Sequence, residues 1–530
     1  MTRARAALAW ALPSLALMLT CGRLGLIEPT ETRYAEIARE MLAGDWLIPH
    51  LNGIPHFHKP PLSYWIGAAG MAAFGRNEFA VRLGAALAAG LILWCTARMA
   101  ALRDGARGQI LAPLLLASTA LFFILSHQLA SDIFLTAAVA GFYAAYLDPR
   151  TRRSLWPFVA LAAGFMAKGP VVFILTIAPV LLASLWARDG AASRPLARVG
   201  GWIVFALLAL PWYLFVLLQT RGLFTFFMRS QIWERYTTTV HQRGGPIYYF
   251  VLVILAGGLP WVVASLRGAR AAAERRPGFE RALLVTWIAL PLLFFSFSGS
   301  KLPAYVLPVF PALALLAASE LESPARGTTI ATTAILFLLA AAVEIGAFLS
   351  QRVAPQPLGF WMAAHVATFF LAAAGVDAWR GGWVRSGALV FAALVVLLWT
   401  LRPLDLRLGS PRSLARILNE ARRPGEPVVE YGAFNAGIPF YLGTTVPMVD
   451  VPRDLDLVDS AMRSRVLVAS GELPRMTAAR GRVWVVGEPG DVSRLGNALG
   501  LKAAHVAGWG KQSLNLLERA QVEPMSPTHR

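Results

Sequence analysis

Long apolar blocks dominate residues 1–402, and short polar stretches between them hold most of the charges. Blocks of about 20 apolar residues are long enough to cross a bilayer as helices. We therefore predict a polytopic α-helical membrane protein with about thirteen transmembrane helices, several of them shorter than a straight span needs. The apolar segments lie near 6–25, 81–99, 109–127, 132–147, 154–167, 170–187, 199–219, 247–266, 281–297, 303–320, 327–348, 358–378 and 385–402.

The pattern changes in residues 403–530, where polar and apolar positions are mixed. Short β-like runs alternate with helix-like stretches there, which is typical of a small α/β domain. We predict two domains: a transmembrane domain over 1–402, whose first outer loop spans 28–80, and a soluble α/β domain over 403–530. The predicted strands are Pro427–Tyr431, Val446–Val449 and Arg482–Val486, and the predicted helices are Arg412–Arg422 and Val492–Leu499.

Composition agrees with a membrane protein, because 56% of the 530 residues are hydrophobic and the mean hydropathy is +0.55. The net charge of +19 does not indicate nucleic-acid binding, since the basic residues are scattered over short loops. Cys21 and Cys95 lie in apolar blocks and have no disulfide or metal-ligand spacing. The segment Met1–Ile27 resembles a signal peptide without a clear cleavage site, so we expect a retained first helix.

Loop charges predict the orientation. The larger set of arginines falls on the side of Arg3 and Arg5, which is therefore predicted to be the cytoplasmic side of the membrane. An odd number of spans then places 403–530 outside the cytoplasm. Basic residues on the outer face, among them Lys59, Lys168 and Lys301, act against this charge bias. We expect them to have a functional reason.

The first outer loop holds two such features. A helix-like segment follows Pro29, with Thr30 or Thr32 as a candidate cap. Its acidic end is either solvated at the membrane surface or held beside a substrate. Further on, Pro60 and Pro61 stiffen the backbone after Lys59, whose side chain either snorkels to the headgroups or binds a substrate.

The loop resembles a known family over Glu28–Met41, Gly44–Trp46 and Lys59–Leu62. These motifs, in this order, are similar to the first outer loop of bacterial lipid A aminoarabinose transferases, members of the protein-mannosyltransferase (GT-C) superfamily. The resemblance covers roughly 1–400. It implies a GT-C fold and sugar transfer from a polyprenyl phosphate carrier on the outer face. It also places Glu28, Thr30, Arg33 and Tyr34 in the active-site loop.

The chain departs from this family at two positions. Thr30 stands where the family usually has the Asp that is most often given a catalytic role. The base is then Glu31 or Asp132, or no base is needed, because a phosphate acceptor is already ionised whereas a hydroxyl acceptor is not. His58 replaces a Glu that helps hold a divalent metal in relatives. With His241 it either binds Zn or Mg or simply forms ordinary hydrogen bonds.

Three later motifs lie on the same face. Asp132 opens a predicted span, either as a cap or, as in relatives, near the reaction centre. Lys168-Gly169-Pro170 splits a long apolar stretch, either as a turn with a snorkelling Lys or as a recurrent family loop motif. The amphipathic stretch 219–246 predicts a surface-lying helix and ends in the family's His-x-x-x-Gly-Pro pattern from His241.

The segment Ser298–Pro308 is the second strong match. It resembles the family's Ser-Lys-Leu-Pro-x-Tyr-x-Leu-Pro, in which Lys and Tyr meet the lipid phosphate. Negative charge builds on that phosphate as it leaves, and fixed cations and hydroxyls stabilise it in a low-dielectric site. The candidate phosphate-binding residues are Lys59, Arg243, Lys301 and Tyr305.

These patterns predict an inverting glycosyltransferase. Its donor is a sugar on polyprenyl (undecaprenyl) phosphate, with 4-amino-4-deoxy-L-arabinose or another pentose or hexose as the sugar. Its acceptor is a glycolipid such as lipid A, on the periplasmic face. The alternatives are a protein O-mannosyltransferase-like enzyme, a lipid-linked sugar transporter or flippase, and an assembly protein whose outer domain binds a partner. Transporters tend to show inverted repeats and helices broken at mid-depth, and the sequence has no visible repeat.

Overall fold

The computed structural model describes residues 2–234, 237–238, 244–273, 277–353, 355–401, 409–451 and 466–519. It divides into two compact units. The helical unit comprises 1–23 and 57–402, and the sheet unit comprises 24–56 and 403–530. The first outer loop is therefore shared between the units, with its division at residues 56 and 57.

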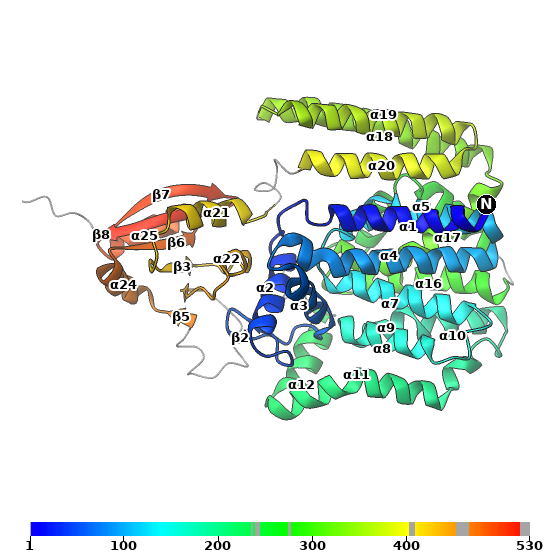
Figure 1. The fold of residues 1–530 in the computed structure, drawn as a ribbon. Coiled ribbons are helices and arrows are strands. Elements are labelled where there is room, and N and C mark those ends of the chain that lie inside the picture. The colour runs from blue at the N-terminus through cyan, green and yellow to red at the C-terminus, as the bar shows by residue number, and fades with distance from the viewer. Residues whose placement is uncertain are drawn as a thin grey trace, which may run out of the picture. The chain divides into compact units, whose positions relative to one another are not determined.

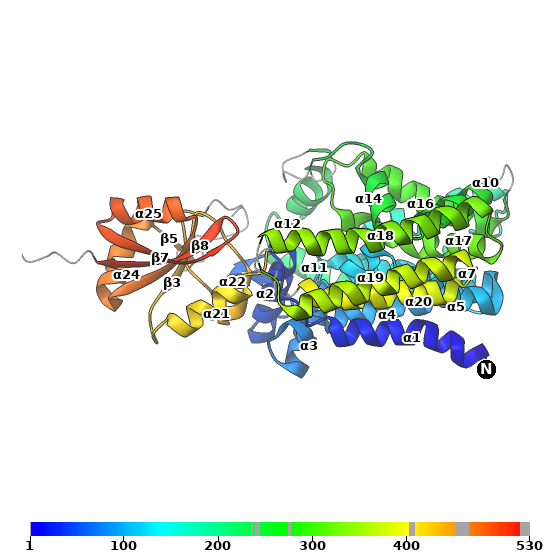
Figure 2. The ribbon, with the colours of Figure 1, turned by 90° about the horizontal axis from the view of Figure 1, so that it is seen from above.

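Helices of the helical unit run side by side along one direction (Figures 1 and 2). Within the described residues, seven helices are long and apolar enough to cross a membrane, or eight if the bent pair α14 and α15 counts as one span. The helices of this unit are α1 (Thr2–Thr20), α3 (Leu62–Phe74), α4 (Glu78–Arg103), α5 (Gly105–Ala117), α6 (Ala120–Leu125), α7 (Ser131–Leu147), α8 (Trp156–Lys168), α9 (Val171–Leu175), α10 (Ile177–Ala187), η1 (Arg194–Ala197), α11 (Val199–Gln219), α12 (Leu223–Thr225), η2 (Phe226–Glu234), α14 (Tyr249–Gly257), α15 (Val262–Ala272), α16 (Phe279–Ser296), η3 (Pro303–Val309), α17 (Phe310–Glu322), α18 (Arg326–Val353), α19 (Leu358–Trp379) and α20 (Trp383–Leu401).

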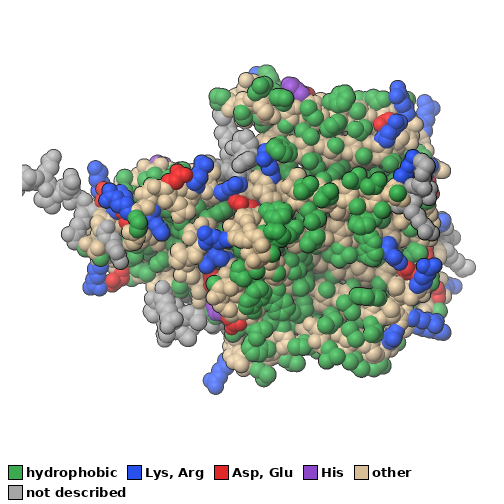
Figure 3. All heavy atoms as spheres, in the orientation of Figure 1, with side chains coloured by type: hydrophobic (Ala, Val, Ile, Leu, Met, Phe, Trp, Pro, Cys, Tyr) green, Lys and Arg blue, Asp and Glu red, His purple; other side chains and the backbone are tan. Residues whose placement is uncertain are grey.

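The outer surface of the helical unit is apolar. Leu207, Leu218 and Phe369 are each at least 67% exposed, although each belongs to a long apolar helix. Figure 3 shows hydrophobic side chains over the flank of these helices, while Lys and Arg gather at the end where α1 begins. Soluble proteins rarely expose apolar patches of this extent, whereas membrane-spanning surfaces do.

Three apolar segments are broken where the sequence predicted single spans. The segment near 170–187 forms α9 and α10, separated at Thr176. The segment predicted near 247–266 forms α14 and α15, which are bent by 116° across the intervening Gly258–Trp261. Pro260 lies in this break and has no N–H for a helix bond. The segment near 109–127 forms α5 and α6, separated at Ser118 and Thr119. Average hydropathy does not detect such breaks, because the residues on both sides remain apolar.

The sheet unit contains a six-stranded sheet in the order β5-β4-β3-β6-β8-β7. Strands β5, β4, β3 and β6 are parallel, and β8 and β7 are antiparallel to their neighbours. The elements are β3 (Val428–Tyr431), β4 (Met448–Val449), β5 (Leu467–Val468), β6 (Arg482–Gly487), β7 (Leu501–Trp509), β8 (Gln512–Arg519), α21 (Arg412–Ala421), α22 (Gly437–Leu442), η5 (Ser470–Glu472), α24 (Leu473–Arg480) and α25 (Pro489–Ala498).

Both faces of this sheet are buried, because successive residues of a strand point to opposite faces. Val428 of β3 packs in one cluster with Leu414 of α21 and Ile438 of α22. Val429 packs in the other cluster with Leu473 of α24 and Leu495 of α25. Helices α21 and α25 accordingly lie on opposite sides of the sheet (Figure 2).

Residues 24–56 complete the sheet unit. They form α2 (Thr30–Ala43) and an antiparallel hairpin of β1 (His50–Leu51) and β2 (Ile54–Pro55). Helix α2 packs against α22, and Ile54 joins an apolar cluster with Met448 and Val466. The buried residues of α2 include Glu31 and Glu36 as well as its apolar positions, so this helix buries more than one apolar stripe.

Candidate active site

The predicted site residues are distributed over both units. His58, Lys59, Asp132, Lys168, Lys301 and Tyr305 belong to the helical unit. Glu28, Thr30, Glu31, Arg33 and Tyr34 belong to the sheet unit. Arg243 and His241 lie outside the described residues.

Three of the predicted residues meet in the helical unit. The Lys168 ammonium donates to Oδ1 of Asp132, and the two side chains are 9% and 12% exposed. The same Nζ lies 4.1 Å from the centroid of the Tyr305 ring, a cation–π distance. The structure therefore joins the Asp132, Lys168 and Tyr305 motifs into one buried cluster.

The positions of Asp132 and Lys168 at helix ends help to stabilise their buried charges. Asp132 lies in the first turn of α7, and Lys168 is the last residue of α8. Acidic groups are favoured at helix N-termini and basic groups at C-termini. Gly169 ends α8 with a φ of +76°, which favours glycine, and Pro170 precedes α9. The break predicted from Lys168-Gly169-Pro170 is thus confirmed. It places Lys168 beside Asp132 at the start of α7.

An aromatic group surrounds Tyr305, which is 7% exposed in η3. Its ring stacks on Phe250 at 6.3 Å between centroids and tilts against Phe295 at 5.4 Å. Within the described part of the chain, the Tyr305 hydroxyl makes no hydrogen bond. The ring is held by packing, which leaves the hydroxyl available to a ligand.

Lys301 is 7% exposed and is held by the loop after α16. Its Nζ donates to the carbonyl oxygens of Ser296 at 2.9 Å and Ser298 at 2.6 Å. An ammonium has three donors, so one of them has no acceptor among the residues that the structure describes. Burial lowers the pKa of Lys301. The Oγ atom of Ser300 is buried without a hydrogen-bond partner among the described residues. An anionic oxygen is a suitable partner for either group.

Lys59 and His58 are half-buried and precede Pro60 and Pro61, directly before α3 begins at Leu62. The His58 ring lies 5.6 Å from that of Phe226. Among the described residues, no group of three or more His, Cys, Asp or Glu side chains is arranged to hold a metal ion. The described donors therefore do not make a complete metal site.

In the sheet unit, two predicted carboxylates accept backbone hydrogen bonds. Glu28 Oε1 accepts from the Gly437 N–H at 2.6 Å, and burial raises the pKa of Glu28. Glu31 is 3% exposed, and its Oε2 accepts from the Ile27 N–H at 3.0 Å. The predicted threonine cap is wrong, because Pro29 occupies the N-cap position of α2 and provides no side-chain bond. Thr30 and Arg33 are half-buried, and Tyr34 is buried.

Comparison with known proteins identifies the family. Residues 22–227 match the family described as Dolichyl-phosphate-mannose-protein mannosyltransferase. A protein of Pectobacterium carotovorum subsp. carotovorum (strain PC1), named Undecaprenyl phosphate-alpha-4-amino-4-deoxy-L-arabinose arabinosyl transferase, is 31% identical over 404 residues, which cover 70% of this chain and 71% of the relative. The chain belongs to this arabinosyl transferase family. The resemblance inferred from the motifs is confirmed.

Other family members match a shorter part. The protein of that name in Serratia proteamaculans (strain 568) is 33% identical over 318 residues, 57% of this chain. The match spans 56% of that relative's length, little more than half. Among solved structures, ArnT from Cupriavidus metallidurans bound to undecaprenyl phosphate has a TM-score of 0.80 at 24% identity, covering 96% of this chain and 97% of that one. This likeness shows a shared fold. Together with the apolar helices, family membership makes the chain a multi-pass membrane protein.

The structure adds residues to the candidate active site that sequence reasoning missed. Phe250 and Phe295 hold the Tyr305 ring, and no sequence signal separates them from other apolar residues of their helices. Ser300 lies within a motif that the sequence did identify, and its position directly before Lys301 was a usable signal.

Proposed function

We propose that this chain is a membrane glycosyltransferase that moves a sugar from a polyprenyl phosphate, such as undecaprenyl phosphate, to a glycolipid acceptor such as lipid A. The observation that carries the proposal is the contact of Lys168 with both Asp132 and Tyr305. It joins a carboxylate to the family's phosphate motif. The relatives' names state transfer of 4-amino-4-deoxy-L-arabinose, which makes this the first donor sugar to test.

In the proposed reaction, the bond between the anomeric carbon and the phosphate oxygen breaks. The electron pair leaves with the polyprenyl phosphate, and an acceptor oxygen attacks the opposite face of the anomeric carbon. Direct displacement of this kind inverts the configuration. Lys59, Arg243, Lys301 and Tyr305 are proposed to stabilise the leaving phosphate, Arg243 as a bidentate donor and the lysines as point charges. The third donor of Lys301 supports its part in this role.

Asp132 is our first candidate for the carboxylate at the anomeric centre. Its side chain is paired with Lys168, and a carboxylate at this position can stabilise positive charge on the sugar or accept a proton. Glu31 is the second candidate, with Glu28, Thr30, Arg33 and Tyr34 in the surrounding loop. Thr30 is compatible with a phosphate acceptor, since an ionised phosphate needs no general base.

The proposed topology has thirteen spans, a cytoplasmic N-terminus and an active site on the periplasmic face of the inner membrane. The gathering of Lys and Arg at the end of the helical unit where α1 begins supports this orientation (Figure 3). We propose domain limits of 1–402 for the membrane domain, including the outer loop 28–80, and 403–530 for a periplasmic α/β domain. The six-stranded sheet and its helices support the second domain.

We further propose a test of His58 and His241 as ligands of Zn²⁺ or Mg²⁺. Two histidines leave the remaining metal positions to water or to substrate oxygens. If a metal acts here, chelation should lower transfer, and added metal should restore it in wild type but not in His58→Ala. Full activity after chelation would refute the metal role.

Transfer of labelled sugar from undecaprenyl phosphate to lipid A in vesicles tests the function, with mass spectrometry of the lipid A fraction as the readout. Lys301→Ala and Lys59→Ala should abolish most transfer, and Lys511→Ala, at an exposed lysine of the sheet unit, should not. Label in protein rather than lipid would instead favour the protein mannosyltransferase alternative, which the match over 22–227 supports. Movement of the donor across the membrane without transfer would favour a flippase.

A further inference from the structure

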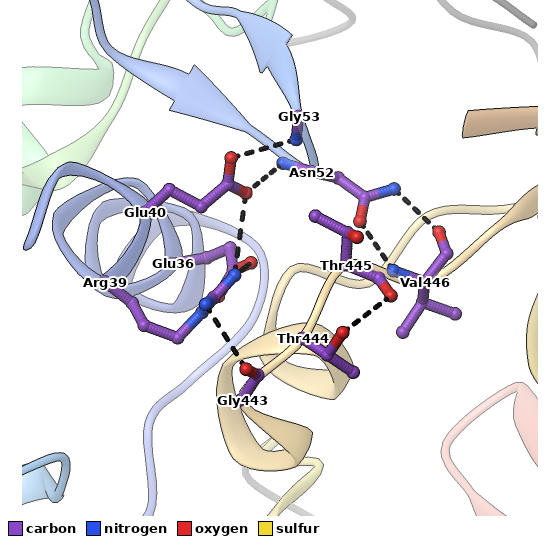
Figure 4. A network of polar contacts seen from close by, with 9 residues as sticks. All are labelled: Glu36, Arg39, Glu40, Asn52, Gly53, Gly443, Thr444, Thr445 and Val446. Carbon is purple, nitrogen blue, oxygen red and sulfur yellow. Dashed lines mark hydrogen bonds and ion pairs between the residues drawn. The ribbon is translucent and has the colours of Figure 1, made fainter. Parts of the chain in front are cut away.

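Asn52 links the hairpin of the first outer loop to the strand region of the sheet unit (Figure 4). Its side chain is fully buried, and its Nδ2 donates to the Val446 carbonyl oxygen at 2.8 Å. Its Oδ1 accepts from the Val446 N–H, also at 2.8 Å. The amide thus pairs with both backbone groups of Val446, as a neighbouring strand would. The residue has a φ of +55°, a conformation that Asn tolerates better than most residues.

The Glu40 carboxylate accepts hydrogen bonds from the backbone of the same turn. The N–H groups of Asn52 and Gly53 donate to its Oε1 and Oε2 at 2.5 and 2.9 Å. A carboxylate that accepts two backbone N–H bonds makes strong, charge-assisted contacts. Because Glu40 belongs to α2, this turn connects the helix to Val446.

A second contact comes from Arg39. Its Nη1 donates to the Gly443 carbonyl oxygen at 3.4 Å. Its Nε and Nη2 each donate to Glu36 at 2.7 Å in a bidentate pair, and Glu36 is fully buried. The pair limits the rotamers of Arg39 and so directs its remaining donor to Gly443 (Figure 4).

The beginning of α2 is held by the same segment. The Gly437 N–H donates to Glu28, and the Leu26 N–H donates to the Tyr441 hydroxyl at 2.9 Å. Gly437 has no room for a side chain, since a Cβ would lie 3.0 Å from Glu28 Oε1 and 2.3 Å from Cγ of Pro411. Both ends of α2 and the following turn therefore contact residues 437–446.

We propose that segment 437–446 positions α2 for sugar transfer, and that Asn52 and Gly437 are positioning residues that never touch the substrate. The inference rests on the proposed function. Glu28 and Glu31 lie at the start of α2, and a displacement of about 1 Å in reacting groups lowers rates by up to about a hundredfold. A surface loop alone is mobile, whereas buried bonds to a sheet restrict it. The C-terminal sheet then serves catalysis as a scaffold.

The described candidates for phosphate binding, Lys59, Lys301 and Tyr305, all belong to the helical unit. Loosening α2 should therefore lower kcat and leave the KM for the polyprenyl donor nearly unchanged. A general loss of folded protein would instead lower the amount of active enzyme and its melting temperature. This difference separates positioning from a merely structural role.

The experiment uses the full chain in nanodiscs with undecaprenyl-phosphate-linked aminoarabinose and lipid A. For Asn52→Ala and Gly437→Ala we expect a fall in kcat of about ten- to a hundredfold, a donor KM within about threefold, and faster hydrogen exchange in residues 28–43. Asn52→Asp keeps the acceptor for the Val446 N–H but sets a buried carboxylate oxygen against the Val446 carbonyl oxygen, so it should lower kcat at least as much as Asn52→Ala. Thr444→Ala, at an exposed neighbour, and Ser513→Ala, which removes two buried hydrogen bonds elsewhere in the sheet, should match wild type in kcat and in exchange of 28–43.

Unchanged hydrogen exchange in residues 28–43 would overturn the proposal that segment 437–446 restrains α2. Faster exchange with unchanged kcat, or an equal effect of Ser513→Ala on kcat, would overturn positioning. If Asn52→Ala does not fold, the exchange and kcat of Gly437→Ala decide between these outcomes. If wild type transfers no sugar although the exchange results hold, the proposed function is refuted, and with it the role of segment 437–446 in catalysis. The restraint of α2 by this segment would still be supported.

Discussion

Removing one member of the buried Asp132–Lys168 pair leaves the other charge without its partner. The two side chains are 12% and 9% exposed, so water compensates little. Breaking a buried pair costs about 3–5 kcal/mol, whereas replacing both members with neutral groups costs much less. Lys168 also lies over the Tyr305 ring, a contact worth about 0.5–2 kcal/mol.

We therefore expect Asp132→Asn and Lys168→Met each to lower the free energy of unfolding by about 3–5 kcal/mol. The double variant should lose clearly less than the sum, with a coupling energy of about 2 kcal/mol or more. Denaturant unfolding of the purified protein in micelles measures the cycle. The exposed Glu472–Arg475 pair is a control, and its coupling should be below about 1 kcal/mol.

Transfer assays on the same four proteins separate stability from chemistry. If Asp132 acts on the sugar, the double variant recovers stability but not transfer. Recovery of both would show that the pair is structural and that Asp132 is not catalytic. Additive losses of stability in the two single variants would refute the reasoning, because they would mean that neither charge depends on the other.

The remaining predictions concern single residues. Tyr305→Phe should keep stability within about 1 kcal/mol, because the ring contacts remain, yet lower transfer; unchanged transfer would exclude a role for the hydroxyl. Gly169→Ala should cost about 1–3 kcal/mol in unfolding experiments, since its φ of 76° and ψ of −155° form a conformation that essentially only glycine adopts, while the nearest atom to a Cβ, the Tyr213 hydroxyl oxygen, is an ordinary 3.6 Å away. Burial raises the pKa of Glu36 from 4.5 to about 8, so its folded form holds a proton that the unfolded form releases. The stability that this bound proton adds to the folded protein is fully present below about pH 4.5 and is lost as the pH rises to about 8. Glu36→Gln should therefore gain stability relative to wild type over this range. A constant difference in melting temperature between the two proteins would contradict this prediction.

Local features of the chain were readable because they depend on neighbouring residues. The break after Lys168 follows from Gly169 and Pro170, and the observed α8 ends there. Strands β3 and β6 lie in the predicted runs Pro427–Tyr431 and Arg482–Val486, whose apolar residues suit a sheet buried on both faces. The motif Ser298–Pro308 was recognised from its order of residues alone.

Elements with weak local signals were missed. Strand β7 has mostly exposed or half-buried residues, so its hydrophobic alternation is faint. In the sequence, the glycine at position 510 was the sign of the β7–β8 hairpin, and in the structure it forms the turn with a φ of +56°. The bend of 116° between α14 and α15 was hidden for the opposite reason, since both helices are apolar and read as one span.

The sequence by itself determined the apolar helices, the β-rich C-terminal region and the residue types of the candidate site, because hydrophobic blocks, glycine, proline and motif order are local properties. Only the tertiary structure decided which of these residues meet. Lys168 contacts Asp132 and Tyr305 because the start of α7, the end of α8 and η3 converge. Asn52 pairs with Val446, 394 positions away, because the first outer loop folds onto the sheet. Such contacts depend on the packing of whole elements, and no local pattern carries that information.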